Sequence, residues 1–255
     1  RWALFMCRLI RSELESAQEL GAELITLGGE RNDPALLLAG HWQVGVVALH
    51  RGNLQDAQHH LQHALAASRH IPPGVPRDAP VDLTLVCQGY LGVTRAYQGH
   101  ADAALRLTGQ AVASARQLGN PFGLLFVLFC DAWAATVAEA VTRALDSATE
   151  QAALIRKHGF RHWGIGPQFF QGWAEARNGD PRRGEHQIRA ALAQMDATGT
   201  PGLRAFVLGL LAEAQLLAGD PDQAGDTLRL AIQEADRLGE HLYDPQLRAL
   251  QARLR

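Results

Sequence analysis

The chain has 255 residues, a formal net charge of -2 at pH 7 and a hydrophobic fraction of 47%. Acidic and basic residues are interspersed, so the sequence lacks the basic blocks that bind nucleic acid or an anionic membrane surface. The 3 cysteines lie far apart without a C-x-x-C pair, which favours buried thiols in a reducing, cytoplasmic compartment. The most apolar run, 122–130, is too short to form a bilayer-spanning helix.

The first predicted elements belong to an incomplete unit at residues 1–33. Apolar side chains recur at helical spacing from Trp2 to Ile10, which indicates the end of one helix, and a second helix runs to the pair Gly28-Gly29. The sequence begins without a Met and already inside this pattern. We therefore expect it to be part of a longer multidomain chain.

The next two units are helical hairpins, each with a glycine in its turn. Gly52-Asn53 and Gly99-His100 supply the turns, and the helices are expected at 34–49, 54–69, 82–98 and 101–118. Residues 71–80, between the two hairpins, contain four prolines and a glycine. Proline removes a backbone donor and glycine loosens the backbone, so this segment is predicted to be an irregular loop.

A third hairpin is degenerate, because its turn near Glu139 has no glycine; its helices are expected at 121–136 and 139–158. The fourth and fifth hairpins turn at Gly179-Asp180-Pro181 and Gly219-Asp220-Pro221, which are 40 residues apart. Glycine ends one helix, and Asp-Pro starts the next. A last helix, without a partner, is expected at 241–255.

Small residues recur at fixed offsets from the turn glycines. Gly172 and Ala212 lie seven residues before them, Gly184 and Ala224 lie five after them, and alanine follows at twelve, with Gln151 replacing it in the degenerate hairpin. Small residues at these positions allow helices to cross closely. Such a fixed period is typical of a solenoid, whose single units cannot bury their apolar faces alone.

We therefore predict a single all-α domain, a tetratricopeptide-like right-handed α-solenoid of about eleven or twelve helices with a period of about 40 residues. Its hairpins are expected at about 34–70, 81–119, 120–160, 161–199 and 200–239.

Arrays of this kind bind ligands along the concave face formed by the first helix of each hairpin. Aromatic side chains recur along that face, and such a ladder can bind an apolar peptide, a partner helix or a small hydrophobic molecule. The same pattern is also typical of a core, because a tightly wound superhelix packs these rings on each other. The predicted groove residues are Trp42, His50, Tyr97, Phe126, Phe129, Trp133, Phe169, Trp173, Arg177, Phe206 and Glu213.

The sequence offers no residues for catalysis. His59 and His63 share a helix face at a spacing that can bind zinc, but two ligands alone make a weak site and the H-E-x-x-H arrangement is missing. Lys157 is the only lysine, without a P-loop around it, and neither a G-x-S-x-G elbow nor a nucleophilic cysteine signature is present. We expect no enzyme, no cofactor and no metal site in this segment.

Several stretches resemble the C-terminal tetratricopeptide region of large bacterial AAA/STAND-type signalling ATPases, which often carry a cyclase or DNA-binding domain as well. The matching stretches are 41–67, 99–122, 158–163, Gly172-Trp173-Ala174 and 210–214. The resemblance implies a module that senses a protein, a peptide or a small inducer and regulates an ATPase or output domain of the parent chain. The ATPase module of the parent chain is itself one of the candidate protein partners. A structural array that mediates self-assembly of the parent protein is the alternative.

Overall fold

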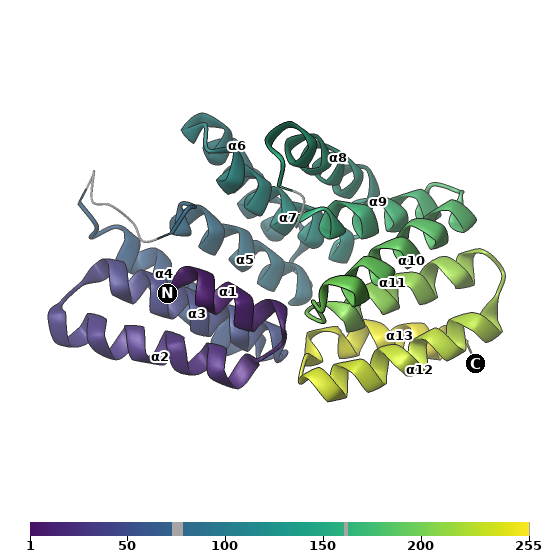
Figure 1. Ribbon diagram of the computed structural model, residues 1–255, viewed down its shortest axis with the longest axis horizontal. Helices are drawn as coiled ribbons and strands as arrows, with labels where there is room; N and C mark the ends of the chain where they lie inside the picture. Colours follow the sequence, from purple (N-terminus) through teal and green to yellow (C-terminus); the bar gives the residue numbers. More distant parts are fainter. Residues whose placement is uncertain (73–78, 161–162, 255) are drawn as a thin grey trace.

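The computed structural model describes residues 1–72, 79–160 and 163–254, and these residues form helices without any strand (Figure 1). The expected all-helical repeat fold is confirmed. The helices are α1 (Trp2–Ile10), α2 (Leu14–Arg31), α3 (Pro34–His50), α4 (Leu54–Ser68), α5 (Leu83–Tyr97), α6 (Ala101–Leu118), α7 (Pro121–Val137), α8 (Val141–His158), α9 (Ile165–Arg177), α10 (Pro181–Thr198), α11 (Arg204–Leu217), α12 (Pro221–Leu238) and α13 (Asp244–Arg253), with a short 3-10 helix, η2 (His241–Tyr243), before α13.

The described residues hold 13 α-helices, more than the eleven or twelve expected, and the first of them, α1, contacts α2. Parts of three expectations lie outside the described residues: most of the loop at 71–80, the positions 161–162, and residue 255. None of the described helices combines the length and the apolar character needed to cross a bilayer.

The hairpin turns share one backbone conformation. The turn glycines, Gly52 and Gly219 among them, have φ of 79° and 82°, in the left-handed region that favours glycine. Ser12 and Glu139 adopt the same conformation, both with φ of 56°. The degenerate hairpin therefore keeps the turn of its neighbours without their glycine, and α1 turns into α2 through the same backbone conformation.

A second series of left-handed residues ends the even-numbered helices. Gly119, Gly159, Gly199 and Gly239 cap α6, α8, α10 and α12 with φ between 62° and 75°. These glycines follow each other at steps of 40 residues. They mark the repeat of about 40 residues as clearly as the turn glycines, on which the prediction from the sequence rested.

The small residues at fixed offsets hold the helices of a hairpin in close contact. A Cβ placed on Gly184 would lie 2.3 Å from the carbonyl oxygen of Gly172, so α9 and α10 touch backbone to backbone. Ala191 and Ala231 are completely buried. Gln151, which replaces the alanine, is also buried, and its Nε2 donates to the Leu125 carbonyl at 3.0 Å.

The odd-numbered helices form the inner layer of the array. From α3 onward each of them contacts the next odd-numbered helix, while the even-numbered helices lie outside. In Figure 1 the purple first helices and the yellow last helices both lie in the lower half of the molecule. The two ends of the array are in contact. The N–H of Gly202, just before α11, donates to the Ile10 carbonyl at 2.8 Å, and Gly52 packs against the backbone of His241. The array thus closes on itself.

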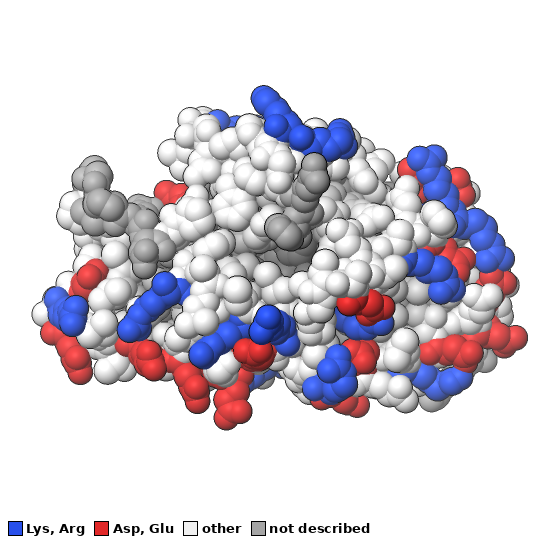
Figure 2. Space-filling model, in the orientation of Figure 1, with Lys and Arg blue, Asp and Glu red and all other residues white. Residues whose placement is uncertain are grey.

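Both signs of charge are interspersed along the lower and right edges of the face in Figure 2, and Lys and Arg side chains gather at its upper edge. Cys87 and Cys130 are buried, and burial raises the pKa of both thiols. Cys7 is exposed, contrary to the expectation of buried thiols, because it lies on the outward face of α1.

Candidate ligand-binding cavities

Aromatic side chains of the inner helices meet in the middle of the closed array. Trp133 on α7 donates its Nε1–H to the Tyr97 hydroxyl at 3.1 Å. The Trp133 ring lies 6.0 Å from Phe206, 6.0 Å from His50 and 6.4 Å from Tyr243, between ring centroids. These rings form an aromatic layer that brings together the first and last repeats, and a cavity lies on each side of it.

The larger cavity, which we call the apolar cavity, has a volume of about 320 Å³. Its wall is made by α1 through Met6, Leu9 and Ile10, and by aromatic residues of α5, α7 and α9. Five predicted groove residues line it: His50, Phe126, Phe129, Trp133 and Phe169. Its volume is at the lower end of the range of small-molecule sites, which are also mostly apolar with a few polar groups.

A buried carboxylate borders the apolar cavity and joins three distant segments. Glu240 is completely buried, and its Oε1 accepts from the Ser12 hydroxyl at 2.9 Å. Its Oε2 accepts from the backbone N–H of Leu203 at 3.1 Å, and His50 Nδ1 lies 3.3 Å from Oε1. We call this group the Glu240 cluster. It connects the first hairpin turn, the end of α3 and the segment before α11.

The smaller cavity, about 170 Å³, is more polar and lies between α9, α11 and α13. Trp173 donates Nε1–H to Glu213 at 2.9 Å, and Arg177 forms ion pairs with both Glu213 and Glu139. The Arg177 guanidinium lies over the Trp173 ring, 5.5 Å from its centroid. The predicted groove residues that line this cavity are Tyr97, Trp173, Arg177, Phe206 and Glu213.

Trp42 is the one predicted groove residue that lines neither cavity. It is completely buried, with its ring 4.9 Å from that of Phe5 on α1. Since α1 packs on α3 through this contact, it covers the face on which Trp42 was expected to be accessible. Trp42 is therefore part of the core.

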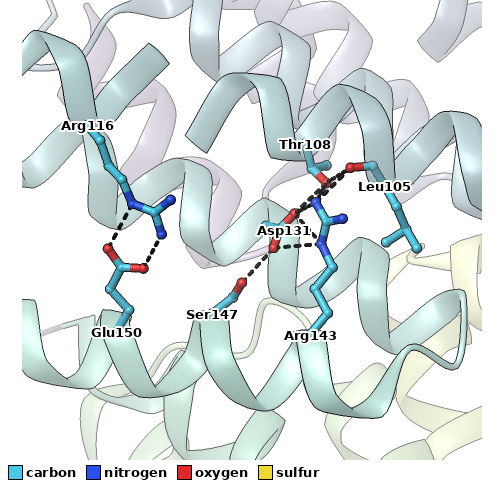
Figure 3. Close-up of polar contacts among 7 residues, drawn as sticks. All are labelled: Leu105, Thr108, Arg116, Asp131, Arg143, Ser147 and Glu150. Atoms are coloured by element: carbon cyan, nitrogen blue, oxygen red, sulfur yellow. Dashed lines mark hydrogen bonds and ion pairs between the residues drawn. The ribbon is translucent and has the colours of Figure 1, made fainter. Parts of the chain in front are cut away.

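A second buried carboxylate, Asp131, holds three helices together (Figure 3). It accepts from Thr108 at 2.5 Å, from Ser147 at 2.6 Å and from Arg143 at 2.6 Å, so α6, α7 and α8 meet at one side chain. Arg143 also donates to the Leu105 carbonyl at 2.7 Å. Asp131 directly follows the apolar run 122–130, and an acid in such a position indicates a buried partner. All its contacts are internal, so its role is structural.

Four histidines gather where α3 meets α4. His41 Nδ1 lies 3.0 Å from His60 Nδ1, and the His41 ring stacks on His63 at 5.2 Å while His59 lies 4.4 Å from His63. Burial and, after it, the neighbouring histidines lower the pKa of His41 from 6.5 to about 4. Among the described residues, no three His, Cys, Asp or Glu side chains are arranged to hold a metal ion.

No protein-family model matches this chain, and no curated protein matches it in sequence. Among solved structures it is similar to a Rap protein complexed with competence and sporulation factor, with a TM-score of 0.63 and 14% identity over 98% of this chain and 73% of that chain. It is also similar to BtubC (BKLC) from P. vanneervenii, with a TM-score of 0.57 and 16% identity over 90% and 92% of the two chains. A third neighbour, a putative kinesin light chain from Podosopora anserina with nearly identical TPR-like repeats, has a TM-score of 0.51 and 18% identity over 86% and 97%. The fold is tetratricopeptide-like.

Proposed function

We propose that this chain is a non-enzymatic sensor module that binds a small apolar inducer in the apolar cavity and regulates an ATPase or output domain elsewhere in a cytoplasmic parent protein. The observation that carries the proposal is the cavity itself: about 320 Å³ of space with a mostly apolar wall, lined by five side chains that the repeat register had placed on the binding face. Aromatic walls supply most of the binding energy in such sites.

The closed array favours a small molecule over a peptide or protein in this place. A peptide that binds along a solenoid groove needs the groove to stay open, whereas Ile10 and Gly202 are hydrogen-bonded across it. A protein partner, such as the ATPase module of the parent chain, would bind to the outer face. The Rap neighbour, complexed with competence and sporulation factor, is a precedent for ligand binding on a similar fold. The link to an ATPase rests on the resemblance in sequence.

Binding of a neutral apolar fluorescent probe, N-phenyl-1-naphthylamine, tests the proposal. We expect saturable binding that is lost in Met6→Trp, because the larger side chain fills the cavity that Met6 lines. The matched control is Leu4→Trp, which adds the same indole to the same helix at a position that is 47% exposed. Equal probe binding by both variants, or the absence of binding to the unaltered chain, would refute the proposal.

Self-assembly of the parent protein has less support from the surface. The exposed large apolar side chains among the described residues are Leu4, Ile10, Leu118, Leu217 and Leu230, and they are distributed over four helices. Single apolar residues of this kind are normal on a monomer, while an assembly surface needs a contiguous patch. Analytical ultracentrifugation of the chain is expected to show a monomer, and a stable oligomer would revive the self-assembly alternative.

A further inference from the structure

We infer that His50 is the recognition group of the apolar cavity, and that it selects ligands which combine an apolar body with one hydrogen-bond donor, such as a hydroxyl group. This inference rests on the proposed function and adds the chemical class of the ligand. His50 is only 3% exposed and its ring lines the cavity. Its Nδ1 is turned toward Glu240, while its Nε2 has no hydrogen-bond partner among the described residues.

The Glu240 cluster fixes which nitrogen of His50 carries the proton. Both carboxylate oxygens of Glu240 accept hydrogen bonds, one from the Ser12 hydroxyl and one from the Leu203 N–H. Because both oxygens of Glu240 already accept, we assign a proton to His50 Nδ1, which then donates to Oε1 at 3.3 Å. When the ring is neutral, this tautomer leaves a lone pair on Nε2. The cavity therefore presents an acceptor, and a ligand group that donates a hydrogen bond satisfies it.

Most other polar groups on the wall already have partners. The hydroxyls of Thr198 and Thr200 bond to each other at 2.8 Å, and Thr198 also contacts the Gln194 carbonyl at 2.8 Å. Trp133 Nε1 is bonded to Tyr97. The Tyr90 hydroxyl is the natural competitor of His50, since it lines the same cavity and has no partner among the described residues. Of these two groups, His50 is the one that is held in place by a contact with a buried carboxylate, that of Glu240.

The arrangement also connects ligand binding to closure of the array. The carboxylate that sets the tautomer of His50 is the one that ties Ser12 to Leu203. When the array opens there, His50 loses the partner that fixes its lone pair toward the cavity. A ligand that donates to Nε2 therefore binds the closed form better than the open form, and this differential affinity is what a sensor needs to shift its conformational equilibrium.

Three probes of nearly equal size test the inference: naphthalene without a polar group, 2-naphthol with a donor, and 2-methoxynaphthalene, whose oxygen can only accept. Their affinities are measured by displacement of N-phenyl-1-naphthylamine. We expect 2-naphthol to bind about tenfold more tightly than 2-methoxynaphthalene, which corresponds to one hydrogen bond to an otherwise unpaired buried group.

Two variants assign this preference to one atom. His50→Asn keeps an amide N–H where Nδ1 lies, so it can still donate to Glu240, but it has no atom in the place of Nε2. We expect it to lose the preference for 2-naphthol over 2-methoxynaphthalene. Tyr90→Phe removes the competing hydroxyl and should retain the preference. Far-UV circular dichroism verifies that both variants fold.

The possible results separate this inference from the proposed function. If none of the three probes binds the unaltered chain, both are wrong. If naphthalene binds but 2-naphthol and 2-methoxynaphthalene have the same affinity, the apolar cavity stands and the role of His50 is refuted, whether or not the variants fold. A preference that disappears in Tyr90→Phe and survives in His50→Asn overturns it as well.

Discussion

Replacing Glu240 by alanine is expected to open the array between its first and last repeats. The substitution removes the acceptor for the Ser12 hydroxyl, the Leu203 N–H and His50 Nδ1, all at one completely buried carboxylate. Removing the acceptor of a buried donor costs about 1–3 kcal/mol, since the donor stays buried without a partner. We expect a loss of this size in the free energy of unfolding.

Urea unfolding followed by circular dichroism measures this loss. The matched control is Glu23→Ala, because Glu23 is exposed and forms a surface ion pair with Arg1 at 3.5 Å, and such pairs contribute about 0–1 kcal/mol. Hydrogen exchange shows where the array opens. Backbone amides of α1 and of the segment before α11 should exchange faster in Glu240→Ala than in the unaltered chain, whereas those of α7 should change little. A loss of less than about 1 kcal/mol, or uniform exchange, would show that the Glu240 cluster does not hold the array closed.

Three further substitutions test the repeat geometry and the histidine group. Gly184→Ala places a Cβ 2.3 Å from a facing backbone oxygen, so it should destabilise the fold by about 1–3 kcal/mol. The control Gly225→Ala, where the nearest atom to the new Cβ is 3.9 Å away, should be neutral or stabilising. Equal melting temperatures of the two variants would contradict this prediction. Glu139→Gly should raise the free energy of unfolding by about 0.5–1 kcal/mol, because it relieves a left-handed φ of 56° in a non-glycine residue. A urea midpoint below that of the unaltered chain would argue against strain at this turn. The pKa of His41 is lowered to about 4, so its stabilising contribution is complete above about pH 6.5 and is lost as the pH falls toward about 4. The full shift corresponds to about 3 kcal/mol, which solvent screening of the partly exposed ring reduces to about 1 kcal/mol. His41→Gln should flatten the pH dependence of stability in that window, and exposed His186→Gln should leave it unchanged.

The helices could be predicted from the sequence because their limits depend on local signals. Glycine turns, Asp-Pro starts and small residues at fixed offsets each act within one hairpin, so they place α3, for example, at Pro34–His50 where 34–49 was expected. The turn at Glu139 was also located, although no glycine marks it. There the register of the neighbouring repeats was enough.

The closure of the array could not be predicted, because it depends on the sum of small rotations over all repeats. A local pattern contains no information about whether Ile10 meets Gly202, and only this contact makes a groove into a cavity. Trp42 is buried for a different reason, because Phe5 of α1 packs against its ring. The roles of Asp131 and Glu240 were missed because the partners of a buried carboxylate lie on other helices, 228 positions away in the case of Ser12 and Glu240.

Closure gives the cavity a property that an open solenoid does not have. Each repeat of a solenoid contacts mainly its neighbours, so a ligand on one repeat has little effect on distant ones. Here the Glu240 cluster connects the turn at Ser12 to the segment at Leu203, and His50 belongs to both the cluster and the cavity wall. A ligand that binds only the closed form stabilises it by about 2.7 kcal/mol at a hundredfold excess over its dissociation constant. That is comparable to the cost of breaking the cluster, so occupancy of the cavity can decide whether the two ends of the array stay together.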